Sequence, residues 1–289
     1  QRIWMSSLYQ LWRFENFLDA GQQTSDGYDR VFVPVVGHTT GEVDTHDLVQ
    51  ETGGRLVFVN TLFNCLCTLS ERKSFKPIWR PPFISEYAPE DRCHLNGLAG
   101  DVQTGEPRFV TAVSRSDVLE GWRDRRGDGG VVVDVQSNEV VAHGLSMPHS
   151  PRLHPEMPDR VWLLNSGTGE FGFVRLDDGG FEPIVFCPGY TRGLTLIGDY
   201  AVIGLSACRE NRTFSGLALQ DRLKEKDVEA RSGLQVINLK SGRVEHSLTI
   251  EGVVRELYDV ITLPGVRRPM MLGFKTDEIK RMLAIDLAE

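Results

Sequence analysis

The amino-acid sequence predicts an all-β protein, and within that class a β-propeller of about six blades with four antiparallel strands each. Short runs rich in Val, Ile, Leu and Phe occur along the whole chain, and small or polar turn residues separate them. A polar opening followed by an apolar strand also recurs at a spacing of roughly 50 residues, which is typical of a propeller blade. Five or seven blades remain alternatives, because strands from both ends of the chain can complete one blade.

The strands follow one another without long helical patterns between them. Turn pairs such as Ser-Gly, Gly-Asp and Lys-Ser-Gly join neighbouring runs at the spacing of antiparallel hairpins. The clearest runs are RVFVPVV, RLVFVNTL, CLCTLS, RFVTAVS, GVVVDVQ, RVWLLNS, FGFVRLD, AVIGLSA and LQVINLK.

Five blade openings are recognised from a polar residue that precedes or begins an apolar strand. They occur in THDLVQ, CHLNGL, PHSPRLH, TRGLTLIG and LYDVITLPG, with marker residues His46, His94, His149, Arg192 and Tyr258. We expect one propeller domain over residues 1–289, whose first blade lacks an opening strand in this sequence. The long last interval contains a charged run at 211–233, which predicts an exposed helical insertion without an apolar stripe.

Composition excludes several classes of partner. The formal net charge is -8 and the pI is near 5.5, so a basic footprint for nucleic acid or an anionic membrane is absent. The arginine-rich stretch GWRDRRGDGG at 121–130 is broken by aspartates and glycines and predicts a solvated hairpin tip. No run of 18 apolar residues occurs. Five cysteines at irregular spacing indicate reduced thiols and a cytoplasmic location.

The repeated openings predict where the chemistry lies. The first strand of each propeller blade lines the central channel, so His46, His94 and His149 are expected to converge at one end of it. Three neutral imidazoles with an open side form the ligand set of a divalent metal, and zinc, iron and manganese are not distinguished by such a set. Asp44 and Asp47 are expected to hold a histidine tautomer from behind.

Further residues in the same openings are assigned to catalysis and substrate binding. Arg192 is expected to bind an anionic group, and Tyr258 or Asp259 to move a proton. Predicted substrate contacts are Asn96, Arg152 and Asp47. Among the remaining histidines, His38 is a reserve fourth ligand and His154 is expected at the surface.

Several strings resemble a bacterial family of conserved hypothetical proteins known only as a domain of unknown function. They include SLYQLWRFENFL, TGEVDTHDL, WRPPFISEYAPEDRCHLNGLA, GLSMPHSPR, LLNSGTGEFG and GYTRGL, and the resemblance extends from about Ile3 to Pro269. It implies a cytoplasmic propeller-like protein, found in some biosynthetic settings, and no particular activity. Family members begin with further residues that this sequence lacks.

These observations favour a metal-dependent lyase, isomerase or hydrolase that acts on a small polar or anionic substrate at the propeller axis. Two alternatives stay open: a metal-free acid–base enzyme that uses the same histidines, and a non-catalytic propeller that binds a partner. We expect a small-molecule substrate, no nucleic acid and no membrane. The sequence leaves the oligomeric state open.

Overall fold

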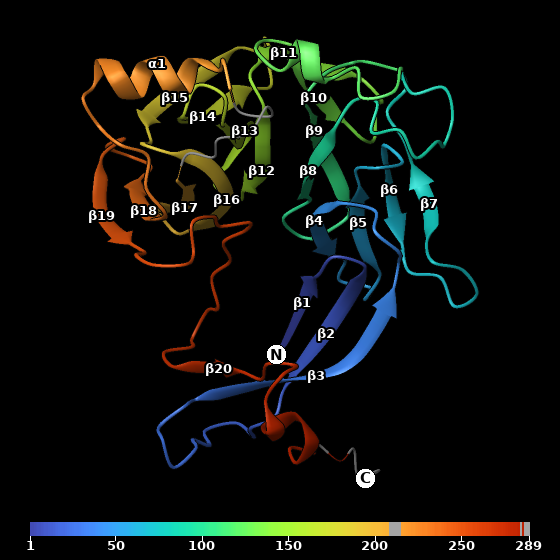
Figure 1. The fold of residues 1–289 in the computed structure, drawn as a ribbon, viewed down its shortest axis with the longest axis vertical. Coiled ribbons are helices and arrows are strands. Elements are labelled where there is room, and N and C mark those ends of the chain that lie inside the picture. The colour runs from blue at the N-terminus through green and yellow to red at the C-terminus, as the bar shows by residue number, and fades with distance from the viewer. Residues whose placement is uncertain (208–214, 284, 286–289) are drawn as a thin grey trace. The chain divides into compact units, whose positions relative to one another are not determined.

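The computed structural model describes residues 1–207, 215–283 and 285, and regular structure in these ranges is mostly β-strand (Figure 1). The described residues form five four-stranded sheets. The predicted all-β propeller with four-stranded blades is therefore confirmed, and the number of blades is five rather than six. The chain divides into two compact units, and four of the sheets belong to the unit Asp44–Thr262.

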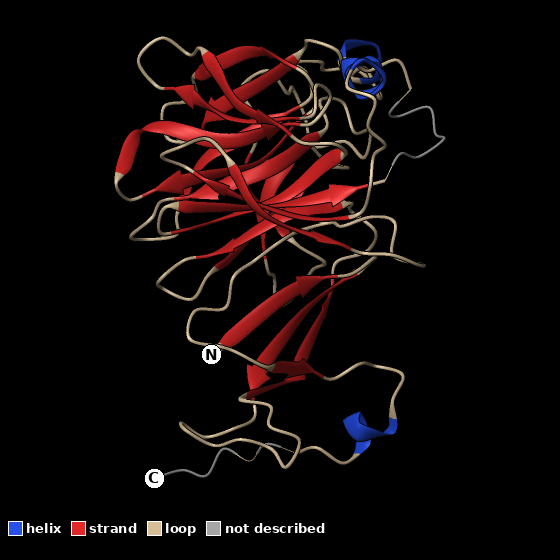
Figure 2. Ribbon diagram, turned by 90° about the vertical axis from the view of Figure 1, so that its left-hand side faces the viewer, coloured by secondary structure: helices blue, strands red, loops and turns tan. Residues whose placement is uncertain are grey.

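In the larger unit each sheet is built from four consecutive strands, ordered in space as in the sequence. Figure 2 draws the strands in red. The first sheet contains β4 (Thr45–Gln50), β5 (Leu56–Asn60), β6 (Cys65–Thr68) and β7 (Lys76–Trp79). The second contains β8 (Leu95–Gly100), β9 (Pro107–Ala112), β10 (Gly130–Asp134) and β11 (Val140–Leu145). The third contains β12 (Pro148–His154), β13 (Met157–Asn165), β14 (Glu170–Arg175) and β15 (Phe181–Phe186). The fourth contains β16 (Tyr190–Ile197), β17 (Tyr200–Ser206), β18 (Gly233–Asn238) and β19 (Val244–Thr249).

The core of this unit lies between neighbouring sheets. One apolar cluster joins the first and second sheets through residues such as Val57, Leu66 and Val110, and another joins the third and fourth through Trp162 and Ile203. Middle strands are therefore apolar on both faces, and every residue of β5 and of β10 is buried. The outermost strand β19 is exposed along its whole length.

The first strands of successive sheets contact one another, β4 with β8, β8 with β12, and β12 with β16. A side-chain hydroxyl at the end of the second strand fixes the next opening. Thr61 Oγ1 donates to the carbonyl oxygen of Leu95 at 2.7 Å, and Ser166 Oγ donates to that of Thr191 at 2.6 Å. Each of these hydrogen bonds ties the start of the first strand in one sheet to the end of the second strand in the preceding sheet, as expected from the repeat.

The fifth opening, at Tyr258, begins no strand, and this prediction was wrong. Ser206 Oγ lies 3.4 Å from the Leu257 carbonyl oxygen, so the segment occupies the position of a next opening. No strand is found at residues 250–262. The Ile250 N–H donates to the Ser232 carbonyl oxygen, and the Ala207 N–H, just after β17, donates to the Arg255 carbonyl oxygen, both at 2.9 Å. Gly193, at φ +83°, lets the chain approach closely, because a Cβ there would lie 2.5 Å from the Val260 nitrogen.

The second unit comprises Gln1–Val43 and Leu263–Glu289. Its sheet has the order β1 (Arg2–Ser6), β2 (Gln10–Asn16), β3 (Arg30–Thr39) and β20 (Pro269–Met271), with β20 parallel to β3. Ile3, Phe14 and Phe32 form a small apolar cluster on this sheet. The all-antiparallel blade expected here is therefore replaced by a sheet with one parallel strand from the far end of the chain.

Two stretches expected at the surface are mostly exposed, as predicted, but each buries apolar side chains. Helix α1 (Ala218–Glu225) lies in the predicted insertion, of which residues 211–214 fall outside the described ranges. Leu219 and Leu223 share one helix face and are buried, so the prediction of no apolar stripe was wrong. Trp122, in the predicted hairpin tip, is only 2% exposed and belongs to the same cluster as both leucines.

The four cysteines in the described ranges are buried free thiols. Cys65 and Cys67 lie two residues apart on β6 and therefore point to the same face of the sheet, where their sulfur atoms are 3.5 Å apart. In the part of the chain that the structure describes, no helix combines the length and apolar character needed to cross a membrane.

Candidate functional site

The structure brings His46, His94 and His149 together from the openings of three sheets. The ring centroids of His46 and His94 are 4.9 Å apart in an edge-on arrangement, and those of His46 and His149 are 6.1 Å apart and nearly parallel, at 15°. We call these three residues the histidine site. The predicted convergence of the three imidazoles is therefore observed, whereas their role is not tested by the geometry alone.

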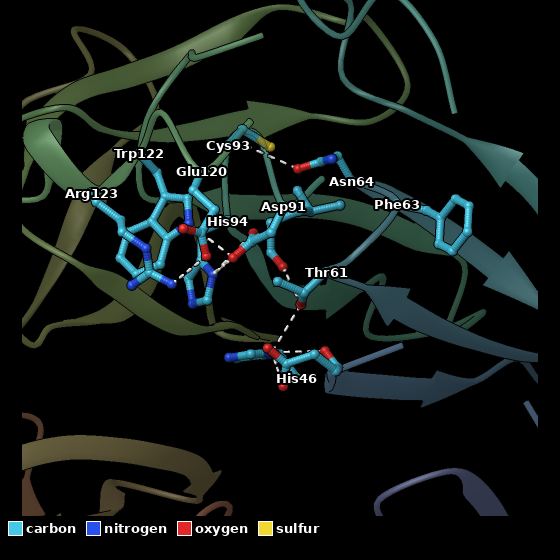
Figure 3. Close-up of polar contacts among 12 residues, drawn as sticks. His46, Thr61, Phe63, Asn64, Asp91, Cys93, His94, Glu120, Trp122 and Arg123 are labelled. Carbon is cyan, nitrogen blue, oxygen red and sulfur yellow. Dashed lines mark hydrogen bonds and ion pairs between the residues drawn. The ribbon is translucent and has the colours of Figure 1, made fainter. Parts of the chain in front are cut away.

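His46 has a fixed tautomer. Its Nδ1 lies 2.9 Å from the Asp44 carbonyl oxygen and 2.8 Å from Thr61 Oγ1 (Figure 3). The Thr61 hydroxyl already donates to the Leu95 carbonyl oxygen, so both neighbours of Nδ1 accept and Nδ1 carries the hydrogen. Burial, aided by Arg192 and the other two imidazoles, holds the pKa of His46 well below its usual value. The ring is therefore neutral, with a free lone pair on Nε2.

His94 is held by a carboxylate and an indole. Its Nδ1 lies 2.9 Å and 3.1 Å from the two carboxylate oxygens of Asp91, and its ring stacks on Trp122 at 4.2 Å between centroids (Figure 3). Trp122 Nε1 donates to the Asp91 carboxylate at 2.8 Å. Because a carboxylate only accepts, Nδ1 of His94 also carries a hydrogen and its Nε2 is left open.

His149 is buried, with 7% of the residue exposed. Burial, followed by the nearby guanidinium of Arg192 and the imidazole of His94, lowers the pKa of His149 well below its usual value. Two imidazoles of the histidine site are therefore neutral near pH 7, as metal ligands and general bases both require.

Left-handed backbone conformations surround the histidine site. Such φ values are uncommon outside glycine and cost free energy at each residue, and they gather at functional sites. The backbone here turns sharply as each strand begins, which lets the histidine side chain leave the sheet. The residues concerned are Asp44 (φ 51°), Asp91 (φ 42°), His94 (φ 52°), Met147 (φ 48°) and Ser150 (φ 52°).

Arg192 and Tyr258 lie beside the histidines, as predicted. The guanidinium carbon of Arg192 is 3.4 Å from the centroid of the Tyr258 ring, and that ring is 5.9 Å from the ring of His46. Nη2 of Arg192 is buried and has no hydrogen-bond partner in the described residues. The Tyr258 hydroxyl lies 3.4 Å from Asp44 Oδ1, and burial raises the pKa of Tyr258. The site therefore offers an unused cationic donor and a phenol that keeps its proton.

Metal binding requires a closer test of the imidazole positions. Two imidazoles on one tetrahedral zinc have ring centroids about 5 Å apart, given a Zn–N distance of about 2 Å. The 4.9 Å separation of His46 and His94 meets this value, whereas the 6.1 Å separation of His46 and His149 is longer. Within the described ranges, no group of three His, Cys, Asp or Glu side chains is arranged as a ready ligand set. His149 would have to turn to complete one.

Three other predicted site residues form a separate network. Arg152 Nη1 donates to Asp47 Oδ2 at 2.8 Å and to the Leu98 carbonyl oxygen at 3.2 Å, and its Nε donates to the Leu194 carbonyl oxygen at 2.9 Å. Asp259 lies 3.6 Å from Nη2 of Arg152. This arrangement ties the first strands of all four sheets together. The predicted substrate contacts of Arg152 and Asp47 and the proton transfer by Asp259 stay predictions, and the network gives these residues a structural use.

Asp259 provides a pH-dependent prediction. Burial and the neighbouring Asp47 raise the pKa of Asp259 to about 6, against an ordinary value of 3.8. Between these values the folded protein binds the proton that the unfolded chain has released, so stability falls as the pH rises from about 4 to 6. The carboxylate is 45% exposed, and solvent screening leaves an effect of about 1 kcal/mol. We expect Asp259→Asn to match the wild type at about pH 3.5, below the unfolded-state pKa, and to be more stable by this amount at about pH 7.5.

Urea unfolding at four pH values between these limits measures the difference. Asp177→Asn is a matched control, because it makes the same chemical change at a side chain that is 82% exposed. A constant difference for Asp259→Asn across the range would contradict the assignment.

Asn96, the remaining predicted substrate contact, is 1% exposed. Thr111 Oγ1 donates to its side-chain oxygen at 2.7 Å, while the side-chain nitrogen is buried without a partner in the described residues. Its assignment to the substrate stays a prediction.

Sequence reasoning missed Asp91, Trp122 and Thr61, which hold the histidine rings. The separation of Asp91 and His94, three residues apart before a strand, was an available signal, and so was a tryptophan within an otherwise charged stretch. Thr61 carried no such signal. The expected surface position of His154 was wrong: His154 is 4% exposed, and its Nε2 lies 3.0 Å from the Gly198 carbonyl oxygen. His38 belongs to the other compact unit.

The fold and the site together define a β-propeller that carries two polar clusters at its inner strands. One is the histidine site, and the other is the network of Arg152, Asp47 and Asp259. The chain belongs to the family described as "Domain of unknown function (DUF4915)", whose match covers residues 1–272. No curated protein matches it by sequence.

Solved structures share the fold at low sequence identity. A protein of unknown function from Bacteroides caccae is 11% identical, with a TM-score of 0.46 over 86% of this chain and 76% of that one. Virginiamycin B lyase from Staphylococcus aureus is 12% identical, with a TM-score of 0.41 over 86% and 68%. Kuenenia stuttgartiensis hydrazine synthase is 12% identical, with a TM-score of 0.42 over 72% of this chain, which spans about half (49%) of the hydrazine synthase chain. These similarities concern the fold alone.

Proposed function

We propose that the protein is a metal-dependent enzyme, a lyase, isomerase or hydrolase, that acts on a small polar or anionic substrate at the histidine site. The observation that carries the proposal is the state of two imidazoles. His46 and His94 both use Nδ1 on acceptors behind them, so both leave a lone pair on Nε2. Metal-binding histidines in proteins are commonly held in this way by a carbonyl or a carboxylate.

His46, His94 and His149 would hold the ion, which would supply a Lewis acid for an oxygen atom of the substrate. Arg192 binds the anionic part of the substrate through Nη2, the donor that the protein leaves unused. Tyr258 keeps its proton, because its pKa is raised, and serves as a proton donor. The histidine side chains are largely shielded from solvent, with 5% of the His46 side chain and 11% of the His94 side chain exposed. Electrostatic interactions with a bound substrate are strengthened accordingly.

A second candidate is a metal-free acid–base enzyme at the same residues. The observation in its favour is the pair formed by His94 and Asp91, which has the hydrogen-bonded arrangement of a catalytic base and the carboxylate that orients it. The near-parallel rings of His46 and His149, 6.1 Å apart, also suit this candidate better than a shared ion.

Elemental mass spectrometry decides between the two candidates. We expect about one divalent metal per chain in full-length protein purified without a chelator or an affinity tag. His94→Ala should lose the metal, and His143→Ala should retain it, because His143 is exposed and lies outside the site. Absence of metal from the wild type, together with failed loading by zinc, iron and manganese, would contradict the metal-dependent proposal and leave the acid–base candidate.

A further inference from the structure

We infer that Asp91 and Trp122 are positioning residues for His94. They fix the tautomer and the plane of its ring so that Nε2 is the open nitrogen. The use of that nitrogen for a metal or for proton transfer rests on the proposed function, whereas the tautomer itself is a property of this chain and is measured separately.

The contacts form a closed triangle of side chains (Figure 3). The Asp91 carboxylate accepts from Nδ1 of His94 at 2.9 Å and from Nε1 of Trp122 at 2.8 Å, and the two rings stack 4.2 Å apart at an angle of 28°. Each residue therefore restrains the other two. The indole N–H restricts the carboxylate, the carboxylate orients Nδ1 of His94, and the indole face sets the imidazole plane.

Trp122 is itself held firmly. Trp122 is 2% exposed and belongs to an apolar cluster with Met147, Tyr190, Leu219 and Leu223. The Arg123 guanidinium carbon also lies 4.5 Å from the centroid of the indole ring. A tryptophan with its N–H used inside a protein is a rigid donor, and a rigid donor can direct a small carboxylate.

His46 provides a contrast within the same site. Its Nδ1 is held by a carbonyl oxygen and a hydroxyl, both neutral, whereas that of His94 is held by a carboxylate. Charge-assisted hydrogen bonds are about twice as strong as neutral ones. His94 is therefore the imidazole whose tautomer depends on one replaceable side chain.

The tautomer of His94 is read from imidazole nitrogen shifts in long-range ¹H–¹⁵N spectra of the ¹⁵N-labelled full chain, before and after chelator treatment. We expect the Nδ1–H form in the wild type. A wild-type spectrum with the hydrogen on Nε2 would overturn the inference, and this measurement requires no variant to fold.

Asp91→Asn tests the part played by the carboxylate. Asparagine suits the left-handed backbone at this position, where φ is 42°. The Trp122 N–H keeps the amide oxygen at the position of Asp91 Oδ2, 2.9 Å from Nδ1 of His94, and places the amide nitrogen at the position of Oδ1, 3.1 Å from the same Nδ1. Nδ1 therefore exchanges one of its two acceptors for a donor and loses the negative charge beside it, so we expect the share of the Nδ1–H form to fall and that of the Nε2–H form to rise. Metal affinity should fall about 10–100-fold.

The double variant Asp91→Asn/Trp122→Phe isolates the part played by the indole N–H. Phenylalanine keeps an aromatic face against His94 but donates no hydrogen bond, so the amide of Asn is free to turn its oxygen toward Nδ1. We expect the Nδ1–H form to return. Trp162→Phe is the matched control, because Nε1 of Trp162 is buried without a partner in the described residues, and this variant should leave the His94 signals unchanged.

The outcomes separate this inference from the proposed function. An unchanged tautomer in Asp91→Asn, or the same spectrum in the single and double variants, would overturn the positioning roles whether or not the protein binds metal. A metal-free protein that shows the expected tautomers would retain the positioning roles and remove the metal proposal alone.

Discussion

Replacing Arg152 with methionine is expected to lower the free energy of unfolding by about 3–5 kcal/mol, the usual cost of removing one partner of a buried ion pair. Asp47, its partner, has a side chain that is 5% exposed, and the variant would leave that charge without its counter-ion. The carbonyl oxygens of Leu98 and Leu194 would also lose a donor. Because these groups belong to three different sheets, the loss affects the whole unit and is measured by equilibrium urea unfolding.

Arg175→Met is the matched comparison. Arg175 makes ion pairs with Asp178 at 2.7 Å and with Glu182 at 3.1 Å, but its side chain is 42% exposed. Exposed pairs contribute less than about 1 kcal/mol. Equal losses in the two variants would show that burial of the Arg152 network does not determine its contribution.

In contrast to Arg152→Met, Arg192→Met is expected to change the free energy of unfolding little and to weaken ligand binding strongly. Its Nη2 has no partner among the described residues, so the fold should lose only the contact of the guanidinium with Tyr258, about 0.5–1 kcal/mol. Binding of a small anion should weaken about 100-fold, which corresponds to the loss of one strong charge-assisted hydrogen bond. Isothermal titration calorimetry with acetate, malonate, citrate and inorganic phosphate measures this effect.

Arg192→Lys separates charge from geometry, since lysine keeps the cation and loses the planar guanidinium. We expect binding intermediate between that of the wild type and that of Arg192→Met. A wild-type protein that binds none of these anions, or an Arg192→Met variant that binds them as tightly as the wild type does, would contradict the role of Arg192.

The repeat carries most of what the sequence predicts correctly. His46, His94, His149 and Arg192 begin strands that contact one another, and a propeller brings first strands to one axis whatever the loops between them do. The predictions of the fold class and of the convergence of the histidines therefore rest on periodicity, which is visible in a single sequence.

Several errors concern segments outside the period. Tyr258 begins no strand, because its segment docks on the end of β17 and against Gly193, and neither contact has a sequence pattern. Trp122 was assigned to solvent from the charges around it, whereas its surroundings come from α1, which is distant in the sequence. The partners of Arg152 are main-chain oxygens, which a sequence does not distinguish from one another.

The packing of α1 on Trp122 links the helix to the histidine site. The helix enters between β17 and β18 and supplies Leu219 and Leu223 to the cluster that holds the indole. Variation at these two leucines would shift the ring against which His94 rests while every polar residue of the histidine site stays the same. A directed-evolution library restricted to this helix is therefore expected to alter ligand preference. Natural substitutions in the insertion would act through the same contact with Trp122.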